Sequence, residues 1–135
     1  MLIHGTATGR LAGGNLSVLT ALIGTEYNIF KENIILFIED IGEQPYRIER
    51  TMYQLELCGA LSRIKGVIVG QFTGIKENPE FEEPYNLIHN IVKKYNIPVC
   101  FGFPVGHSDE NVPLIEGAEC MLTVAKDKTT LDFNL

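Results

Sequence analysis

The chain has 135 residues, of which 45% are hydrophobic and 21% are charged. This length and composition fit one folded domain over residues 1–135 and exclude a disordered, collagen-like or coiled-coil protein. The formal net charge of −6 and the absence of any run rich in Lys and Arg argue against a nucleic-acid partner, which requires a basic surface. No apolar stretch reaches the 18 residues that a membrane span needs, so no membrane partner is expected either.

The first half of the chain predicts a helix, a strand and a second helix, in that order. Residues 5–14 contain four glycines, which are only a weak indication of a phosphate-binding loop and to which no element is assigned. The apolar positions that follow predict a short helix over residues 15–24. The continuous apolar run 34–38 predicts a strand buried on both faces, and the apolar spacing further on predicts a helix over 45–61.

The second half of the chain predicts strands at residues 67–70 and 98–102 on either side of an acidic loop at 76–83 and a helix at 84–95. Three further short strands are predicted, at residues 112–115, 119–125 and 129–133. Strands alternate with helices first and antiparallel strands come last. The order therefore predicts a compact α/β domain with a short, mainly parallel sheet, flanking helices and a C-terminal β-hairpin region.

The three cysteines, Cys58, Cys100 and Cys120, form no CxxC pair, and each has apolar neighbours. This pattern favours buried, unpaired thiols in a reducing compartment, so we expect a cytoplasmic protein.

Polar side chains follow the predicted parallel strands at their carboxyl ends, where open α/β sheets bind their ligands. Glu39 follows the strand at 34–38, and His107 follows the strand at 98–102. Strand ends of one parallel sheet lie side by side at spacings of about 5 Å, so these two side chains are candidates for a contact. A carboxylate beside an imidazole is the orienting half of a nucleophilic triad, in which the imidazole takes a proton from the nucleophile.

Structural explanations for the same residues stay open. A histidine such as His107, after a turn that contains glycine and proline, is more often an ordinary loop residue than a catalyst. Glu39 has Arg47 or a helix N-terminus as an alternative partner, and Asp40 is suited to cap a turn. No HxxxH spacing accompanies these side chains, and we predict neither a metal site nor a cofactor.

A nucleophile is missing from this set. The chain has no GxSxG motif, and its serines are Ser17, in a predicted helix, Ser62, at a helix end, and Ser108, next to His107. The sequence therefore predicts half of an active site.

Four segments resemble the C-terminal domain of the LD-carboxypeptidase family, also called muramoyltetrapeptide carboxypeptidases, which includes the microcin C immunity peptidases. They are GGNL at 13–16, LFIEDIGE at 36–43, PYRIER at 45–50 and GFPVGH at 102–107. The resemblance extends over nearly the whole chain, and the second and third segments together form a long and unusual motif.

The resemblance implies a two-domain serine peptidase with a Ser-Glu-His triad, whose serine and oxyanion hole lie in an N-terminal domain that is absent here. Glu39 matches the triad glutamate and His107 the triad histidine. The implied reaction is release of a terminal D-amino acid from murein tetrapeptide, for peptidoglycan recycling. The expected partners are the N-terminal domain and the murein peptide, and the chain alone is expected to be inactive. No substrate-binding residue is assigned.

Two other functions stay open, and an interaction or dimerisation domain is a third alternative. The chain is expected to be a microcin C-type immunity peptidase domain if its substrate is a peptide–nucleotide, or a catalytically silent peptide-binding module if it works without a serine. A homodimer is also expected, for which the helix at 45–61 and the acidic loop at 76–83 offer surfaces.

Overall fold

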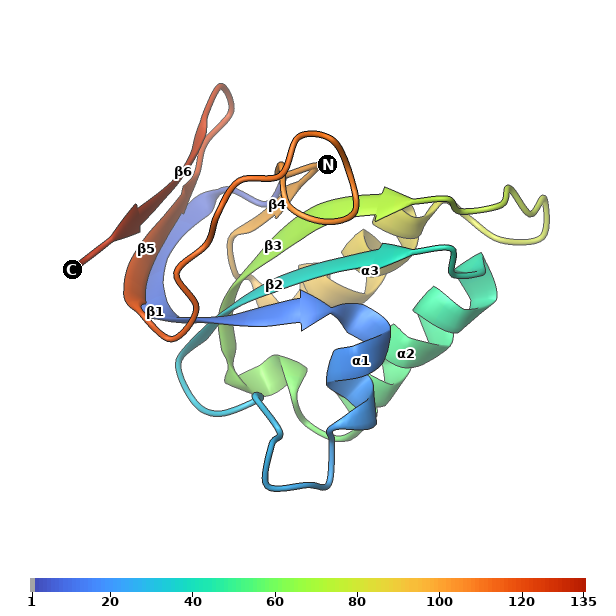
Figure 1. Ribbon diagram of the computed structural model, residues 1–135, viewed down its shortest axis with the longest axis horizontal. Coiled ribbons are helices and arrows are strands. Elements are labelled where there is room, and N and C mark those ends of the chain that lie inside the picture. The colour runs from blue at the N-terminus through green and yellow to red at the C-terminus, as the bar shows by residue number, and fades with distance from the viewer. Residues whose placement is uncertain (1) are drawn as a thin grey trace.

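The computed structural model describes residues 2–135, which fold around one mixed six-stranded sheet with the strand order β4-β3-β2-β1-β5-β6 (Figure 1). Four neighbouring strands run parallel: β1 (Gly5–Asn15), β2 (Ile34–Ile41), β3 (Ile64–Thr73) and β4 (Val99–Phe101). The antiparallel strands β5 (Glu119–Val124) and β6 (Thr129–Phe133) complete the sheet on the far side of β1. This arrangement confirms the predicted α/β class with its parallel core and C-terminal hairpin.

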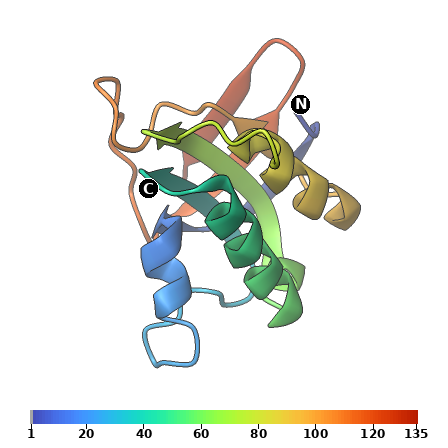
Figure 2. The same cartoon turned by 90° about the vertical axis from the view of Figure 1, so that its right-hand side faces the viewer.

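The helices α1 (Leu16–Ala21), α2 (Pro45–Leu57) and α3 (Pro84–Val92) cover one face of the sheet (Figure 2). Short 3₁₀ turns, η1 (Leu61–Arg63) and η2 (Lys93–Tyr95), follow the second and third helices. The core on this side packs apolar side chains of α2 and α3 against alternate residues of β2 and β3. Of the helices in residues 2–135, none has the length and the apolar run required to cross a membrane.

The opposite face of the sheet carries a second, smaller core that contains no helix. Val105, from the segment after β4, packs there with side chains from β1, β2, β3 and β5. Side chains of one strand alternate between the two faces. In β2, Ile34, Leu36 and Ile38 therefore belong to the helix side, whereas Ile35 and Phe37 belong to the smaller core.

The glycine-rich segment 5–14, for which no helix or strand is predicted, forms most of the long strand β1. Its glycines allow close approach to β2. A Cβ atom added at Gly9 would overlap the carbonyl oxygen of Asn33, and one added at Gly13 would overlap that of Phe37. Glycines that look like a loop in the sequence are thus the residues that let two parallel strands pair closely.

Two predicted elements differ from the structure. Residues 112–115 form an irregular loop whose Val112 and Ile115 side chains are exposed, because Pro113 lacks the N–H that a strand needs. The helix predicted to reach residue 61 ends at Leu57. Gly59 has a φ of +81°, and its N–H together with that of Ala60 closes a Schellman motif on Glu56 and Leu55.

The early stop of α2 also corrects the prediction for one cysteine. Cys58 caps the helix and is exposed, whereas Cys100 and Cys120 are buried as expected. The first helix is shorter than predicted too: α1 ends at Ala21, and its N-cap is Asn15, whose side chain accepts a hydrogen bond from Val18 N–H.

Candidate active site

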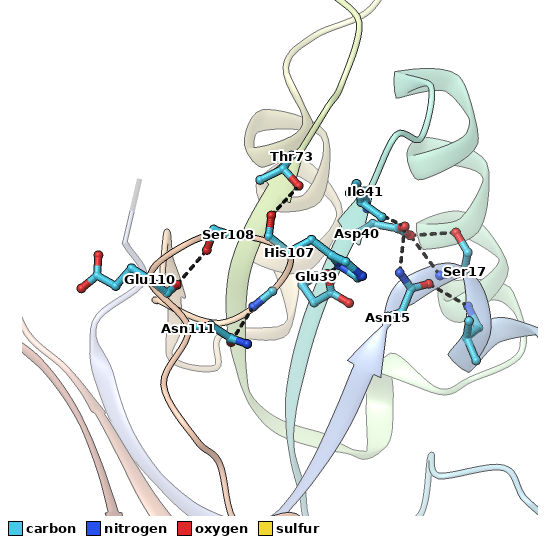
Figure 3. A network of polar contacts seen from close by, with 12 residues as sticks. Asn15, Ser17, Glu39, Asp40, Ile41, Thr73, His107, Ser108, Glu110 and Asn111 are labelled. Atoms are coloured by element: carbon cyan, nitrogen blue, oxygen red, sulfur yellow. Dashed lines mark hydrogen bonds and ion pairs between the residues drawn. The ribbon is translucent and has the colours of Figure 1, made fainter.

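Glu39 and His107 meet at the carboxyl edge of the sheet (Figure 3). Glu39 Oε2 lies 2.7 Å from His107 Nδ1. The carboxylate side chain is 9% exposed, whereas the imidazole is 51% exposed. An ionised carboxylate only accepts hydrogen bonds, so Nδ1 carries the proton and Nε2 is left as the basic nitrogen.

The alternation of β2 explains which carboxylate reaches the histidine. Glu39 continues the row of Ile35 and Phe37, on the face with the smaller core. Val105, which belongs to that same core, leads the chain to His107 two residues later. The two side chains thus approach each other on one face of the sheet.

Gly106 gives His107 its close approach to the sheet. Its φ is +134°, and a Cβ atom there would lie 3.0 Å from the carbonyl oxygen of Gln71 and 3.1 Å from Glu39 Cβ. Any side chain at this position would push the segment that carries His107 away from Glu39.

Asp40 points to the opposite face and does not join the pair. It is 2% exposed and accepts hydrogen bonds from Asn15 Nδ2, the Ser17 N–H and hydroxyl groups, and the Ile41 N–H, at 2.7–3.1 Å (Figure 3). Asp40 therefore ties the start of α1 to the end of β2, which is a larger role than the turn cap considered from the sequence.

Arg47, the other partner considered for Glu39, lies elsewhere. Its guanidinium Nη1 is 3.9 Å from Glu43 Oε2. Glu43 Oε1 in turn lies 3.0 Å from the Ser17 hydroxyl, which also donates to Asp40. Among the described contacts, the ionic partner of Glu39 is His107.

None of the serine hydroxyls in residues 2–135 hydrogen-bonds to His107. Ser17 donates to the Asp40 carboxylate, Ser62 donates to the Gly59 carbonyl oxygen, and Ser108 donates to that of Glu110. The buried thiols are equally unsuited to nucleophilic attack. Burial raises the pKa of Cys100 to about 11 and also raises the pKa of Cys120, so both are protonated at neutral pH.

Within residues 2–135, no group of three or more His, Cys, Asp or Glu side chains is arranged to hold a metal ion. The chemistry that the pair itself supports is proton transfer: an oriented imidazole accepts a proton at Nε2, and the carboxylate stabilises the imidazolium that forms. A base and an orienting carboxylate in a hydrolytic triad would need this arrangement of imidazole and carboxylate.

The fold belongs to the α/β class, and comparison with known sequences gives the family. The profile described as "LD-carboxypeptidase C-terminal domain" matches residues 8–122, so the chain belongs to the LD-carboxypeptidase family and contains its C-terminal domain. The resemblance found in the sequence is thereby confirmed.

Individual relatives agree with this assignment. The "Probable murein peptide carboxypeptidase" of Bacillus subtilis is 33% identical over 135 residues, a match that covers 97% of this chain and 42% of the relative. The crystal structure of muramoyltetrapeptide carboxypeptidase from Oxalobacter formigenes matches with a TM-score of 0.88 at 32% identity, over 98% of this chain and 47% of that one.

The microcin C7 self-immunity protein MccF, in complex with aspartyl sulfamoyl adenosine, has the same fold. It matches with a TM-score of 0.86 at 26% identity, over 98% of this chain and 39% of that one. The chain thus spans less than half the length of each of these three proteins.

Proposed function

We propose that this chain is the part of a serine-type LD-carboxypeptidase that supplies the triad glutamate and histidine, and that the complete enzyme releases a terminal D-amino acid from murein tetrapeptide. The hydrogen bond of 2.7 Å between Glu39 and His107 is the observation that carries the proposal. The names of the Bacillus and Oxalobacter relatives support the murein peptide as substrate. The physiological role proposed is peptidoglycan recycling in the cytoplasm, and the buried, unpaired thiols of Cys100 and Cys120 favour that compartment.

In the proposed reaction, His107 acts first as a base and then as an acid. Its Nε2 takes the proton of the serine hydroxyl while the serine oxygen bonds to the carbonyl carbon of the scissile amide. Glu39 holds the imidazole by Nδ1 and stabilises its positive charge. The proton on Nε2 then passes to the nitrogen of the leaving D-amino acid as the C–N bond breaks, and water hydrolyses the acyl-enzyme by the same two proton transfers.

The serine and the oxyanion donors are proposed to come from an N-terminal domain. The described serine hydroxyls donate to other groups, and the pair alone lacks the stabilisation that an oxyanion hole supplies. We therefore expect the 135-residue chain to be inactive by itself.

The test is D-alanine release from a tetrapeptide with diaminopimelate or lysine before the terminal D-alanine. The 135-residue chain and the protein made from its complete reading frame are assayed side by side. Release by the longer protein alone supports the proposal. Release by the short chain overturns the assignment of the nucleophile, and no release by either overturns the murein substrate.

A peptide–nucleotide is the second candidate substrate, favoured by the likeness to MccF in complex with aspartyl sulfamoyl adenosine. The same two proteins are assayed for hydrolysis of a peptidyl or aminoacyl sulfamoyl adenosine. Cleavage of this compound but not of the tetrapeptide favours the immunity peptidase. Binding of the tetrapeptide without cleavage of either compound favours the silent binding module.

A homodimer is proposed as well, through the outward face of α2. Tyr53 and Leu57 are 47% and 85% exposed there, and Tyr46 precedes them on the same face. Sedimentation equilibrium at increasing concentration tests this proposal. A protein that stays monomeric at every concentration contradicts it, and a Leu57→Glu variant that dissociates the dimer supports it.

A further inference from the structure

The segment after β4 continues along β3 and carries His107 to its place. The Phe103 N–H donates to the Val69 carbonyl oxygen at 3.1 Å, and the Gln71 N–H donates to the Val105 carbonyl oxygen at 2.8 Å. The donor alternates between the two segments as in a parallel ladder, but the spacing is irregular, because β3 bonds to the Phe103 N–H and then to the Val105 carbonyl oxygen rather than to both groups of one residue. The regular strand β4 ends at Phe101, but hydrogen bonding to β3 goes on beyond it.

The last bond of this series is made by a side chain. The Thr73 hydroxyl donates to the carbonyl oxygen of His107 at 3.2 Å (Figure 3). Thr73 also holds the loop after β2, because its own carbonyl oxygen accepts the Gly42 N–H at 2.8 Å. One residue at the end of β3 thus contacts the backbone that follows Glu39 and the backbone of His107.

The position of His107 depends on few other contacts. Its side chain is half exposed and bonds only to Glu39 among the described residues. The preceding residue is Gly106, whose φ of +134° belongs to a conformation that glycine adopts freely. The Gly106 N–H donates to Asn111 Oδ1 at 3.2 Å, a contact within the same segment that does not anchor it to the sheet.

From this geometry we propose that Thr73 is a positioning residue: its hydroxyl fixes the His107 backbone so that the imidazole stays against Glu39. The effect of Thr73 on catalysis rests on the proposed function, whereas its effect on the position of His107 does not. Gln71 supports the same segment one step earlier, because its side-chain amide donates to the Gly102 and Phe103 carbonyl oxygens at 3.0 and 3.3 Å.

Thr73→Val removes the hydroxyl and keeps the shape of the side chain, and Thr73→Ser keeps the hydroxyl. Thr73→Ala is a second variant without the hydroxyl, for the case that valine disturbs folding. The first readout is the proton NMR resonance of His107 Nδ1–H in the 135-residue chain, which needs neither substrate nor N-terminal domain. We expect a sharp low-field signal in the wild type and in Thr73→Ser, and a weakened or exchange-broadened signal in Thr73→Val and Thr73→Ala.

The second readout is kcat and KM for D-alanine release by the longer protein. We expect kcat to fall about fivefold in Thr73→Val with KM unchanged, and to return in Thr73→Ser, because one hydrogen bond of this kind is lost and regained. An unchanged Nδ1–H signal in both variants without the hydroxyl overturns the inference. If the longer protein releases no D-alanine, the proposed function fails, and the NMR readout still decides the role of Thr73.

Discussion

Glu39 Oε2 and His107 Nδ1 lie 2.7 Å apart although 68 positions separate the two residues in the sequence. The contact forms because β2 and the continuation of β4 lie on either side of β3, with both side chains on the face of the smaller core. A buried carboxylate then meets a half-exposed imidazole, whose Nε2 is the nitrogen left for a reacting group.

Glu39→Gln removes the charge and keeps the size of the side chain. The amide no longer favours the tautomer with the proton on Nδ1, so the basic nitrogen at Nε2 is lost in a large share of molecules. We expect kcat of the longer protein to fall about a thousand- to ten-thousandfold with the fold intact. Glu119→Gln, at the exposed first position of β5, is the matched control and is expected to retain full activity. Turnover of Glu39→Gln near the wild-type rate would contradict the orienting role.

Asp40→Ala is expected to act on stability. The substitution leaves the Asn15 amide and the Ser17 and Ile41 N–H groups without their buried acceptor. Urea unfolding of the 135-residue chain is expected to give a free energy of unfolding lower by about 3 kcal/mol. Asp132→Ala, at an exposed position of β6, is expected to change it by less than about 0.5 kcal/mol. Equal values for the two variants would show that the Asp40 contacts contribute nothing.

Comparison of Gly106→Ala with Gly117→Ala separates the effect of close packing from the effect of backbone strain. An added Cβ at Gly106 meets Gln71 and Glu39 atoms, whereas Gly117, with a φ of +85°, has open space around the same position. Gly117→Ala is expected to cost about 1 kcal/mol through strain alone and to leave kcat unchanged. Gly106→Ala is expected to cost about 2–3 kcal/mol and also to weaken the Nδ1–H resonance of His107. A wild-type resonance in Gly106→Ala would argue against the need for this close approach.

Because the Cys100 thiol is buried, we expect the protein to lose stability at alkaline pH. Burial raises its pKa from the ordinary value of 9.0 to about 11, so the folded state keeps a proton that the unfolded chain loses. The associated stability is complete below pH 9 and is lost as the pH rises toward 11, by up to about 3 kcal/mol. Denaturant unfolding at pH 8.5 and pH 11 is expected to reveal a smaller drop in Cys100→Ala than in the wild type. The same drop in both proteins would mean that other groups, such as Tyr85, account for it.

The sequence was sufficient for the elements with clear periodicity and for the two residues of the pair. The apolar run of β2 and the polar residues after it predict where Glu39 lies, because strand ends of a parallel sheet share one edge. The sequence was insufficient for β1. Its glycines permit close strand pairing, but a cluster of glycines in a single sequence more often indicates a loop. The exposure of Cys58 follows from a Schellman motif at Gly59, and the hydroxyl of Thr73 acts on a segment 34 residues away. Gly59 is a local stop signal that the apolar spacing over 45–61 outweighed, whereas no local pattern predicts the Thr73 contact.

His107 is proposed as the base of an enzyme whose serine lies outside this chain, and removing its imidazole tests that role directly. D-alanine release from murein tetrapeptide is measured for the longer protein as wild type and as His107→Ala, with matching thermal unfolding curves. We expect release by the wild type and a fall of at least about a thousandfold in the variant. Release at comparable rates by both proteins would contradict it.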